Sequence, residues 1–160
     1  SRDEAALTRG MHAFAKAQRT QCHVAAGHGV NLGPNLAESV KKYRGRDLLE
    51  QIIDPSKSIH EKYRTMQFVL DSGRVVSGVV LEETPAAYRV ATNLLAPDQV
   101  TVIKKGEIDE QLAGTVSAMP AGLLNVLTRD EIVDLVSFVE AGDELPESLR
   151  HAPPHGTGSN

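Results

Sequence analysis

Cys22 and His23 are adjacent in this chain of 160 residues, and their side chains offer its most specific chemistry. A thiolate can form a covalent bond, and an imidazole nitrogen can bind a metal ion. The pair matches the end of Cys-x-x-Cys-His, at which c-type haem is attached by two thioether bonds and a histidine ligand. Arg19 occupies the position of the first cysteine, and the chain has no other cysteine. The sequence therefore allows one thioether bond at most.

The Cys-His pair is also compatible with an ordinary structural role that involves no cofactor. Cysteine is among the most buried residue types and often serves as a small apolar side chain in a core. A buried Cys22 beside a surface His23 would fit that role. The interpretation of the pair therefore depends on the sequence around it.

The composition is that of a globular protein and argues against several functions. The length fits one domain with a sizeable core. The formal net charge of −4 argues against a general nucleic-acid surface, which would be basic. No apolar run approaches the roughly 20 residues of a transmembrane helix. No signal peptide is visible, so we expect a mature protein or an excised domain.

Helical periodicity predicts elements on both sides of the Cys-His pair. Residues 3–18 carry an apolar face with helical spacing, and Gly10 on that face would let a second helix approach closely. A helix break at Gly10 is the alternative. Glycines and a proline make residues 24–35 a loop whose backbone can lie against a flat ligand. Two shorter helices are expected, at residues 36–43 and 46–53.

Alternating apolar residues predict strands in the middle of the chain. Residues 64–70 and 74–81 should pair as a hairpin around the turn at 71–73. Two weaker strands are expected at residues 88–92 and 99–104. Because neighbouring strands usually pair in sequence order, the four should form an antiparallel meander.

A second irregular segment with a candidate ligand precedes the last predicted helix. It contains Met119 and Pro120. A methionine can simply fill a gap in a core, but its thioether is also a common sixth ligand of haem iron. Thr128 and Glu131 form a capping box that starts a helix running to about residue 140.

A series of short motifs follows in a fixed order along residues 5–140. They are Gly10-x3-Phe14, Cys22-His23, Gly33-Pro34-Asn35-Leu36, Leu48-Leu49-Glu50-Gln51-Ile52-Ile53-Asp54-Pro55-Ser56-Lys57-Ser58-Ile59, Asp71-Ser72-Gly73-Arg74 with Ser77-Gly78, Ser117-Ala118-Met119-Pro120-Ala121-Gly122-Leu123, Leu127-Thr128-x2-Glu131 and Asp134-Leu135. In this order the chain resembles the planctomycete-type haem-binding cytochrome c domain, which is similar to class I cytochrome c. The chain departs from the family pattern at Arg19.

The resemblance implies a mainly α, cytochrome c-like helical domain with a small antiparallel β meander inserted into it, an α+β arrangement. The single domain would span residues 1–142. Its helical parts would be about 1–60 and 114–142, and its β insertion about 61–113. Residues 143–160 are expected to form a flexible tail.

The resemblance also implies one haem c per chain and a role for each ligand. Cys22 would form the single thioether bond, and His23 would bind the iron through Nε2. The carbonyl of Pro34 would accept a hydrogen bond from Nδ1 of that ring. Met119 would take the sixth position. The other candidates for that position are Met11, Met66, His28 and His60, of which the two methionines fit core positions.

Further residues at the haem are implied in the same way. They are Leu32, Gly33, Leu36, Tyr43, Leu48, Leu49, Ile52, Pro120, Leu123, Leu124 and Leu127. The apolar ones fit an ordinary core equally well. Candidates for contact with the haem propionates are Tyr43, Tyr63, Arg44 and Arg46, since an arginine fork suits a carboxylate.

An iron with both axial positions filled by protein transfers electrons and has no open position for substrate. We therefore expect an electron carrier rather than an enzyme, located in the periplasm or otherwise exported, as c-type haem implies. Its partners would be redox proteins, with no nucleic acid and no membrane span. Two alternatives stay open. One is a haem enzyme or gas sensor in which Met119 is a labile or absent ligand, and the other is a haem-free interaction domain.

Overall fold

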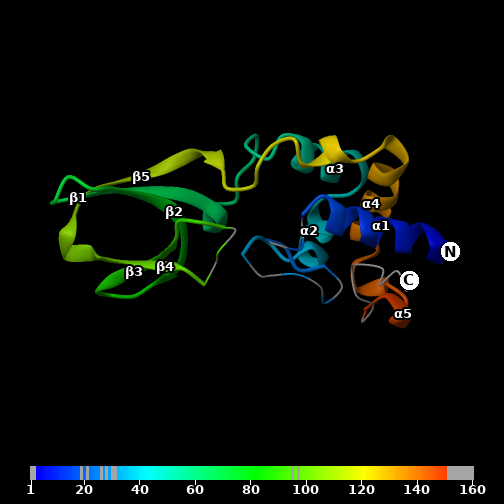
Figure 1. Ribbon diagram of the computed structural model, residues 1–160, viewed down its shortest axis with the longest axis horizontal. Coiled ribbons are helices and arrows are strands. Elements are labelled where there is room, and N and C mark those ends of the chain that lie inside the picture. Colours follow the sequence, from blue (N-terminus) through cyan, green and yellow to red (C-terminus); the bar gives the residue numbers. More distant parts are fainter. Residues whose placement is uncertain are drawn as a thin grey trace, which may run out of the picture. The chain divides into compact units, whose positions relative to one another are not determined.

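The computed structural model describes residues 3–18, 20, 22–25, 27, 29, 32–94, 96 and 98–150. The chain divides into two compact units. The helical unit comprises Ser1–Asp54 and Ala121–Asn160, and the sheet unit comprises Pro55–Pro120. Helices make up most of the regular structure of the first unit and strands most of the second (Figure 1).

The two longest described helices, α1 (Glu4–Lys16) and α4 (Arg129–Ala141), pack against each other in the helical unit. The capping box at the start of α4 is present as predicted. Thr128 Oγ1 accepts a hydrogen bond from the N–H of Glu131, whose carboxylate accepts one from the N–H of Thr128. Each helix has 13 residues. Since a bilayer needs roughly 20, no helix in the described part of the chain could cross a membrane.

Gly10 lies at the contact between α1 and α4. A Cβ atom at this position would lie 2.6 Å from the Cβ of Phe138 and would collide with the carbonyl oxygen of Asp134. The rings of Phe14 and Phe138 are buried at the same contact, with centroids 5.8 Å apart. The predicted close approach of a second helix at Gly10 is therefore confirmed.

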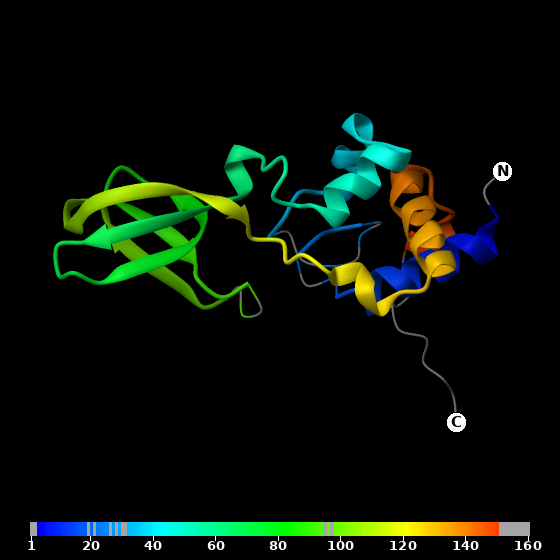
Figure 2. The same ribbon diagram turned by 90° about the horizontal axis from the view of Figure 1, so that it is seen from above.

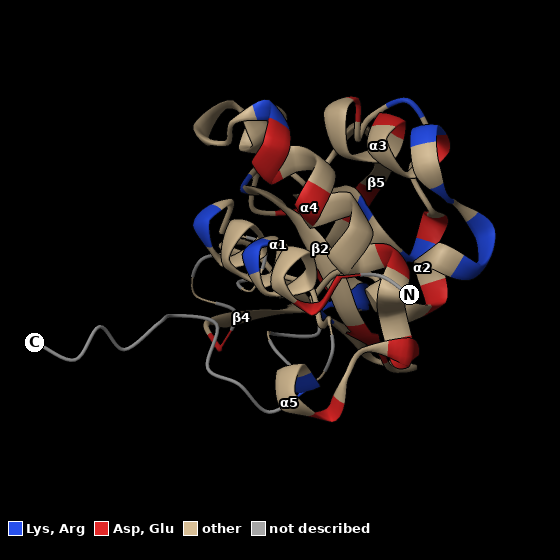
Figure 3. Ribbon diagram, turned by 90° about the vertical axis from the view of Figure 1, so that its right-hand side faces the viewer, with Lys and Arg blue, Asp and Glu red and all other residues tan. Residues whose placement is uncertain are grey.

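Short helices complete the helical unit. They are α2 (Leu36–Lys42), α3 (Gly45–Ile53), η4 (Leu123–Val126), η5 (Gly142–Glu144) and α5 (Glu147–Arg150). The first two lie where the sequence predicted helices. Acidic and basic positions are interspersed on α1 to α4 (Figure 3).

Residues 143–150 differ from the expected flexible tail. They contain the end of η5 and the whole of α5. Leu145 and Leu149 are 2% and 5% exposed, so burial of apolar side chains holds this segment. The rest of the expected tail, residues 151–160, lies outside the described residues.

The sheet unit contains five antiparallel strands. They are β1 (Arg64–Leu70), β2 (Val75–Glu83), β3 (Ala87–Ala91), β4 (Val100–Lys104) and β5 (Ile108–Ser117), with 3-10 turns at η2 (Glu61–Tyr63) and η3 (Lys105–Glu107). The strand order is β4-β3-β2-β1-β5. The sheet curls (Figure 2) around buried side chains from β1 to β4. This core consists of Phe68, Leu70, Val76, Val90 and Ile103.

The expected mainly α, cytochrome c-like fold with a small inserted meander is wrong. The protein is α+β, and its five-stranded antiparallel sheet has a hydrophobic core of its own. The four predicted strands are present, but the sequence pattern missed β5. This edge strand has no buried position, and its apolar residues do not alternate with polar ones. Leu112 and Val116 of β5 are 46% and 67% exposed.

Candidate haem site

His23 is the one polar side chain among the described residues that is buried, with 6% of its surface exposed. Its Nδ1 atom lies 2.9 Å from the carbonyl oxygen of Pro34. A carbonyl can only accept, so in the neutral ring Nδ1 carries the hydrogen and Nε2 carries the lone pair. Nε2 is therefore the ring nitrogen that could act as an acceptor or a metal ligand. The partner of Nδ1 is the one that the resemblance implies.

Glycines bring the loop backbone against the His23 ring. A Cβ atom on Gly33 would lie 2.7 Å from Cε1 and 2.9 Å from Nδ1 of His23. Gly29 has a φ of +104°, and a Cβ there would collide with the carbonyl oxygen of His23. Gly29 and Gly33 thus form a glycine cradle around His23, in which a side chain at either position would collide with the histidine. The sequence indicated a glycine-rich loop but not the particular role of Gly29.

Backbone hydrogen bonds close this loop on the Cys-His pair. The N–H groups of Leu32 and Gly33 both donate to the carbonyl of Cys22, at 3.1 Å and 2.6 Å. Asn35 then caps α2 by accepting a hydrogen bond from the N–H of Ala37 at 2.9 Å. The loop returns to a helix directly after Pro34, which holds the Pro34 carbonyl in place for His23.

The helical unit contains most of the other residues predicted at the haem. Leu36, Leu48, Ile52 and Leu124 are buried, while Cys22, Leu32, Tyr43, Leu49, Leu123 and Leu127 are half-buried. Helix α3, which carries Leu48 and Ile52, contacts η4, which carries Leu124. Among these, the structure brings Cys22, His23, Gly33 and Pro34 together directly. Arg19 and His28 lie outside the described residues.

Met119 belongs to the sheet unit, just after β5. It is half-buried, and Pro120 next to it is exposed. The N–H of Met119 donates to Ser117 Oγ at 3.2 Å, and the N–H of Ser117 donates to Ser56 Oγ at 3.0 Å. These bonds hold the methionine segment at the end of the sheet. Because His23 belongs to the other unit, their pairing at one iron stays a prediction.

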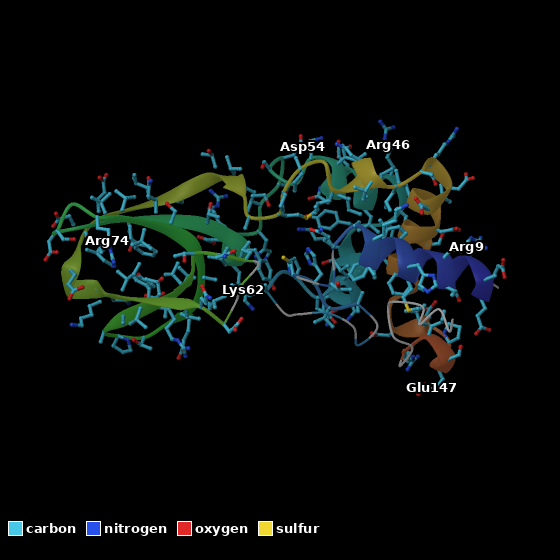
Figure 4. The ribbon with its side chains drawn as sticks, viewed as in Figure 1. Arg9, Arg46, Asp54, Lys62, Arg74 and Glu147 are labelled. Atoms are coloured by element: carbon cyan, nitrogen blue, oxygen red, sulfur yellow. The ribbon has the colours of Figure 1, made fainter. Side chains whose placement is uncertain are left out.

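The remaining methionines and the predicted propionate partners have other surroundings. Met11 is buried in the helical unit, and Met66 packs against the core of the sheet. Arg44 donates from Nε to the carbonyl of Val40 at 3.1 Å. Arg46 is exposed on α3 (Figure 4). The predicted propionate partners Tyr43 and Tyr63 are half-buried, and the ammonium groups of Lys42 and Lys62 lie over their rings.

A cavity of about 340 Å³ lies in the helical unit, beside the loop after His23. It is lined by Val24, Gly27, Asn35, Ala37, Gly142, Asp143 and Arg150. Neither residue of the Cys-His pair lines it. The cavity is therefore lined by other residues of the helical unit.

The described residues contain no group of three or more His, Cys, Asp and Glu side chains that could hold a metal ion. A haem iron takes one histidine and one methionine from the protein, so the prediction does not depend on such a group. Comparison with protein-family models found no matching family, and a search of curated proteins found no match. The function is therefore inferred from the motifs and from the geometry around His23.

Proposed function

We propose that this chain is a c-type electron carrier with one haem c, held by a single thioether bond at Cys22 and by the His23 ring. The supporting observation is the 2.9 Å contact between His23 Nδ1 and the Pro34 carbonyl, which places the ring hydrogen on Nδ1 and the lone pair on Nε2, the nitrogen that would bind the iron. The close approach of Gly29 and Gly33 to His23 is a second supporting observation, since it fixes the orientation of a buried imidazole. The motif order that resembles planctomycete-type haem domains supports the same proposal.

Cys22 would supply the covalent link. Its thiol would add across a haem vinyl group, so that the sulfur would join one vinyl carbon and the hydrogen the other. This addition balances without an oxidant. Cys22 is next to His23 in the chain, and its carbonyl accepts hydrogen bonds from Leu32 and Gly33, so the link and the ligand would belong to one hydrogen-bonded segment.

His23 and Met119 would be the axial ligands. The hydrogen bond to Pro34 raises the basicity of Nε2 and fixes the plane of the ring. A methionine thioether as the sixth ligand favours the ferrous state and raises the reduction potential. When bound, haem supplies an iron that gains and loses one electron. A c-type haem also implies a periplasmic or otherwise exported location and redox proteins as partners.

The test is a pyridine haemochrome spectrum together with mass spectrometry of the full chain, expressed with haem-maturation genes. One haem should remain attached after denaturation. The α band should lie between the positions for two saturated vinyl groups and for none, and Arg19→Cys should move it to the two-thioether position. A chain without a bound chromophore, or with haem lost on denaturation, would contradict the single covalent link.

A further inference from the structure

Strand β5 forms one edge of the sheet, with β1 on one side and no described strand on the other (Figure 1). It is the longest described strand, with 10 residues, and every side chain from Asp109 to Ala113 is exposed. Pairing of its backbone with β1, rather than burial of its own side chains, therefore holds it in the sheet. An edge strand of this kind presents a row of N–H and C=O groups to which a further strand can bind.

The opposite edge of the sheet, β4, is better protected against such pairing. It has only 5 residues and ends at Lys104, whose side chain is 74% exposed. Short strands and exposed lysines are two features by which natural proteins block an edge. β5 contains neither lysine nor proline, and its apolar side chains Leu112 and Val116 are 46% and 67% exposed. We therefore expect a further strand to bind at β5.

The face on which each β5 side chain lies follows from its pairing with β1. Leu112 pairs with Gln67 and Glu110 pairs with Val69. Phe68, between these two β1 residues, belongs to the core on the inner face of the sheet. Because successive side chains of a strand point to opposite faces, Leu112 and Glu110 lie on the outer face.

Two copies of β5 fit each other best in one antiparallel register. A two-fold axis normal to the sheet keeps both outer faces on the same side, so the axis passes between two copies of one residue. With Leu112 at the axis, each Leu112 faces its own copy and each Glu110 faces Gly114 of the second copy, which leaves room for the carboxylate. An axis at Glu110 would oppose like charges, which destabilises a strand pair. An axis at Gln111 or Ala113 would place no apolar side chain opposite Leu112.

We propose that two copies of this chain associate through β5 about a two-fold axis at Leu112, which joins their sheets into one continuous sheet. This inference goes beyond the proposed electron transfer and does not depend on haem. The pairing covers the exposed surface of Leu112 and occupies both β5 edges. Only the short β4 edges then remain free, so association stops at the dimer.

The test measures the mass of the full chain by light scattering over a series of concentrations. The wild type should reach twice the mass of one chain. Leu112→Lys places two lysines face to face at the axis and should reduce the mass to that of one chain. The matched control is Val102→Lys on the β4 edge, where the valine is 59% exposed. This variant should keep the mass of the dimer.

Mixing two variants tests the position of the axis. Leu112→Glu alone should also be monomeric, whereas a mixture of Leu112→Lys and Leu112→Glu should regain the dimer, because a lysine then faces a glutamate. A mixture that stays monomeric, or a dimer that Val102→Lys disrupts and Leu112→Lys does not, would overturn the proposal.

Amide hydrogen exchange of the wild type needs no variant that folds. Exchange in residues 110–114 should slow as the concentration rises, while exchange in β4 should stay unchanged. A wild-type chain that is monomeric at every concentration would overturn the proposal and leave the β5 edge to a strand of another protein.

Discussion

Gly33→Ala should disturb the His23 ring by steric contact alone. The new Cβ would lie 2.7 Å from His23 Cε1, whereas ordinary contacts begin at 3.4 Å, so the ring or the loop must move by at least about 0.7 Å. Gly33 does not have a positive φ, so backbone strain adds nothing to the cost. Overpacking costs about 1–3 kcal/mol, and loss of the hydrogen bond to Pro34 adds about 1 kcal/mol. We expect a loss of about 2–4 kcal/mol in the free energy of unfolding.

Urea unfolding of the haem-free chain measures this cost, with Gly106→Ala as the matched control. Gly106 also lacks a positive φ, but nothing lies within 4 Å of a Cβ placed there. In the haem-loaded protein, Gly33→Ala should also weaken the iron–imidazole bond, seen as partial high-spin character in the ferric spectrum. If the unfolding free energies of Gly33→Ala and Gly106→Ala agree within about 0.5 kcal/mol, Gly33 does not hold the His23 ring by close contact.

Two further predictions concern the sixth ligand and the α1–α4 contact. Met119→Ala should make the ferric haem high-spin and quick to bind cyanide. Met66→Ala should leave the haem spectrum unchanged and lower only the stability. The reverse pattern would show that the ligand assignment is wrong. The pKa of Glu131 is lowered chiefly by its hydrogen bond to Lys16, across from α4 to α1. Because the pKa of Glu131 is lower in the folded state, its ion pair stabilises the fold at a pH above the unfolded pKa of about 4.3. That stabilisation is lost as the pH falls through the pKa of Glu131 in the folded state. Lys16→Gln should therefore be less stable than the wild type at pH 6 and equal to it near pH 2, and a difference that persists in acid would contradict this pairing.

The features that the sequence predicted well are local ones. The capping box spans Thr128 and Glu131, and the loop that joins His23 to Pro34 spans only 11 residues. Their geometry follows from neighbours in the chain. Gly10 was also informative, because a glycine costs stability inside a helix and is tolerated on an apolar face where a second helix packs closely.

The features that the sequence missed depend on distant parts of the chain. Strand β5 is exposed almost throughout, so only its pairing with β1 defines it as a strand. The half-burial of Arg64 in β1 was also missed, because arginines are usually exposed and burial is set by the rest of the fold. A signal was nevertheless present. Arg64 lies two, four and six positions before Met66, Phe68 and Leu70 in β1, so its side chain is on the same face of the strand. The apolar face of β1 therefore begins with an arginine.

The pairing of β1 with β5 has a consequence for the order of folding. The sheet unit spans 66 residues from Pro55 to Pro120, yet Ser56 Oγ accepts a hydrogen bond from the N–H of Ser117 at 3.0 Å. Once the sheet has formed, the chain that links α3 to η4 behaves as a short connection rather than a long loop. Loop-closure entropy grows with the logarithm of length, so this shortening favours the contact between α3 and η4 by about 2 kcal/mol. A sheet that folds first would therefore speed assembly of the helices on either side of it in sequence.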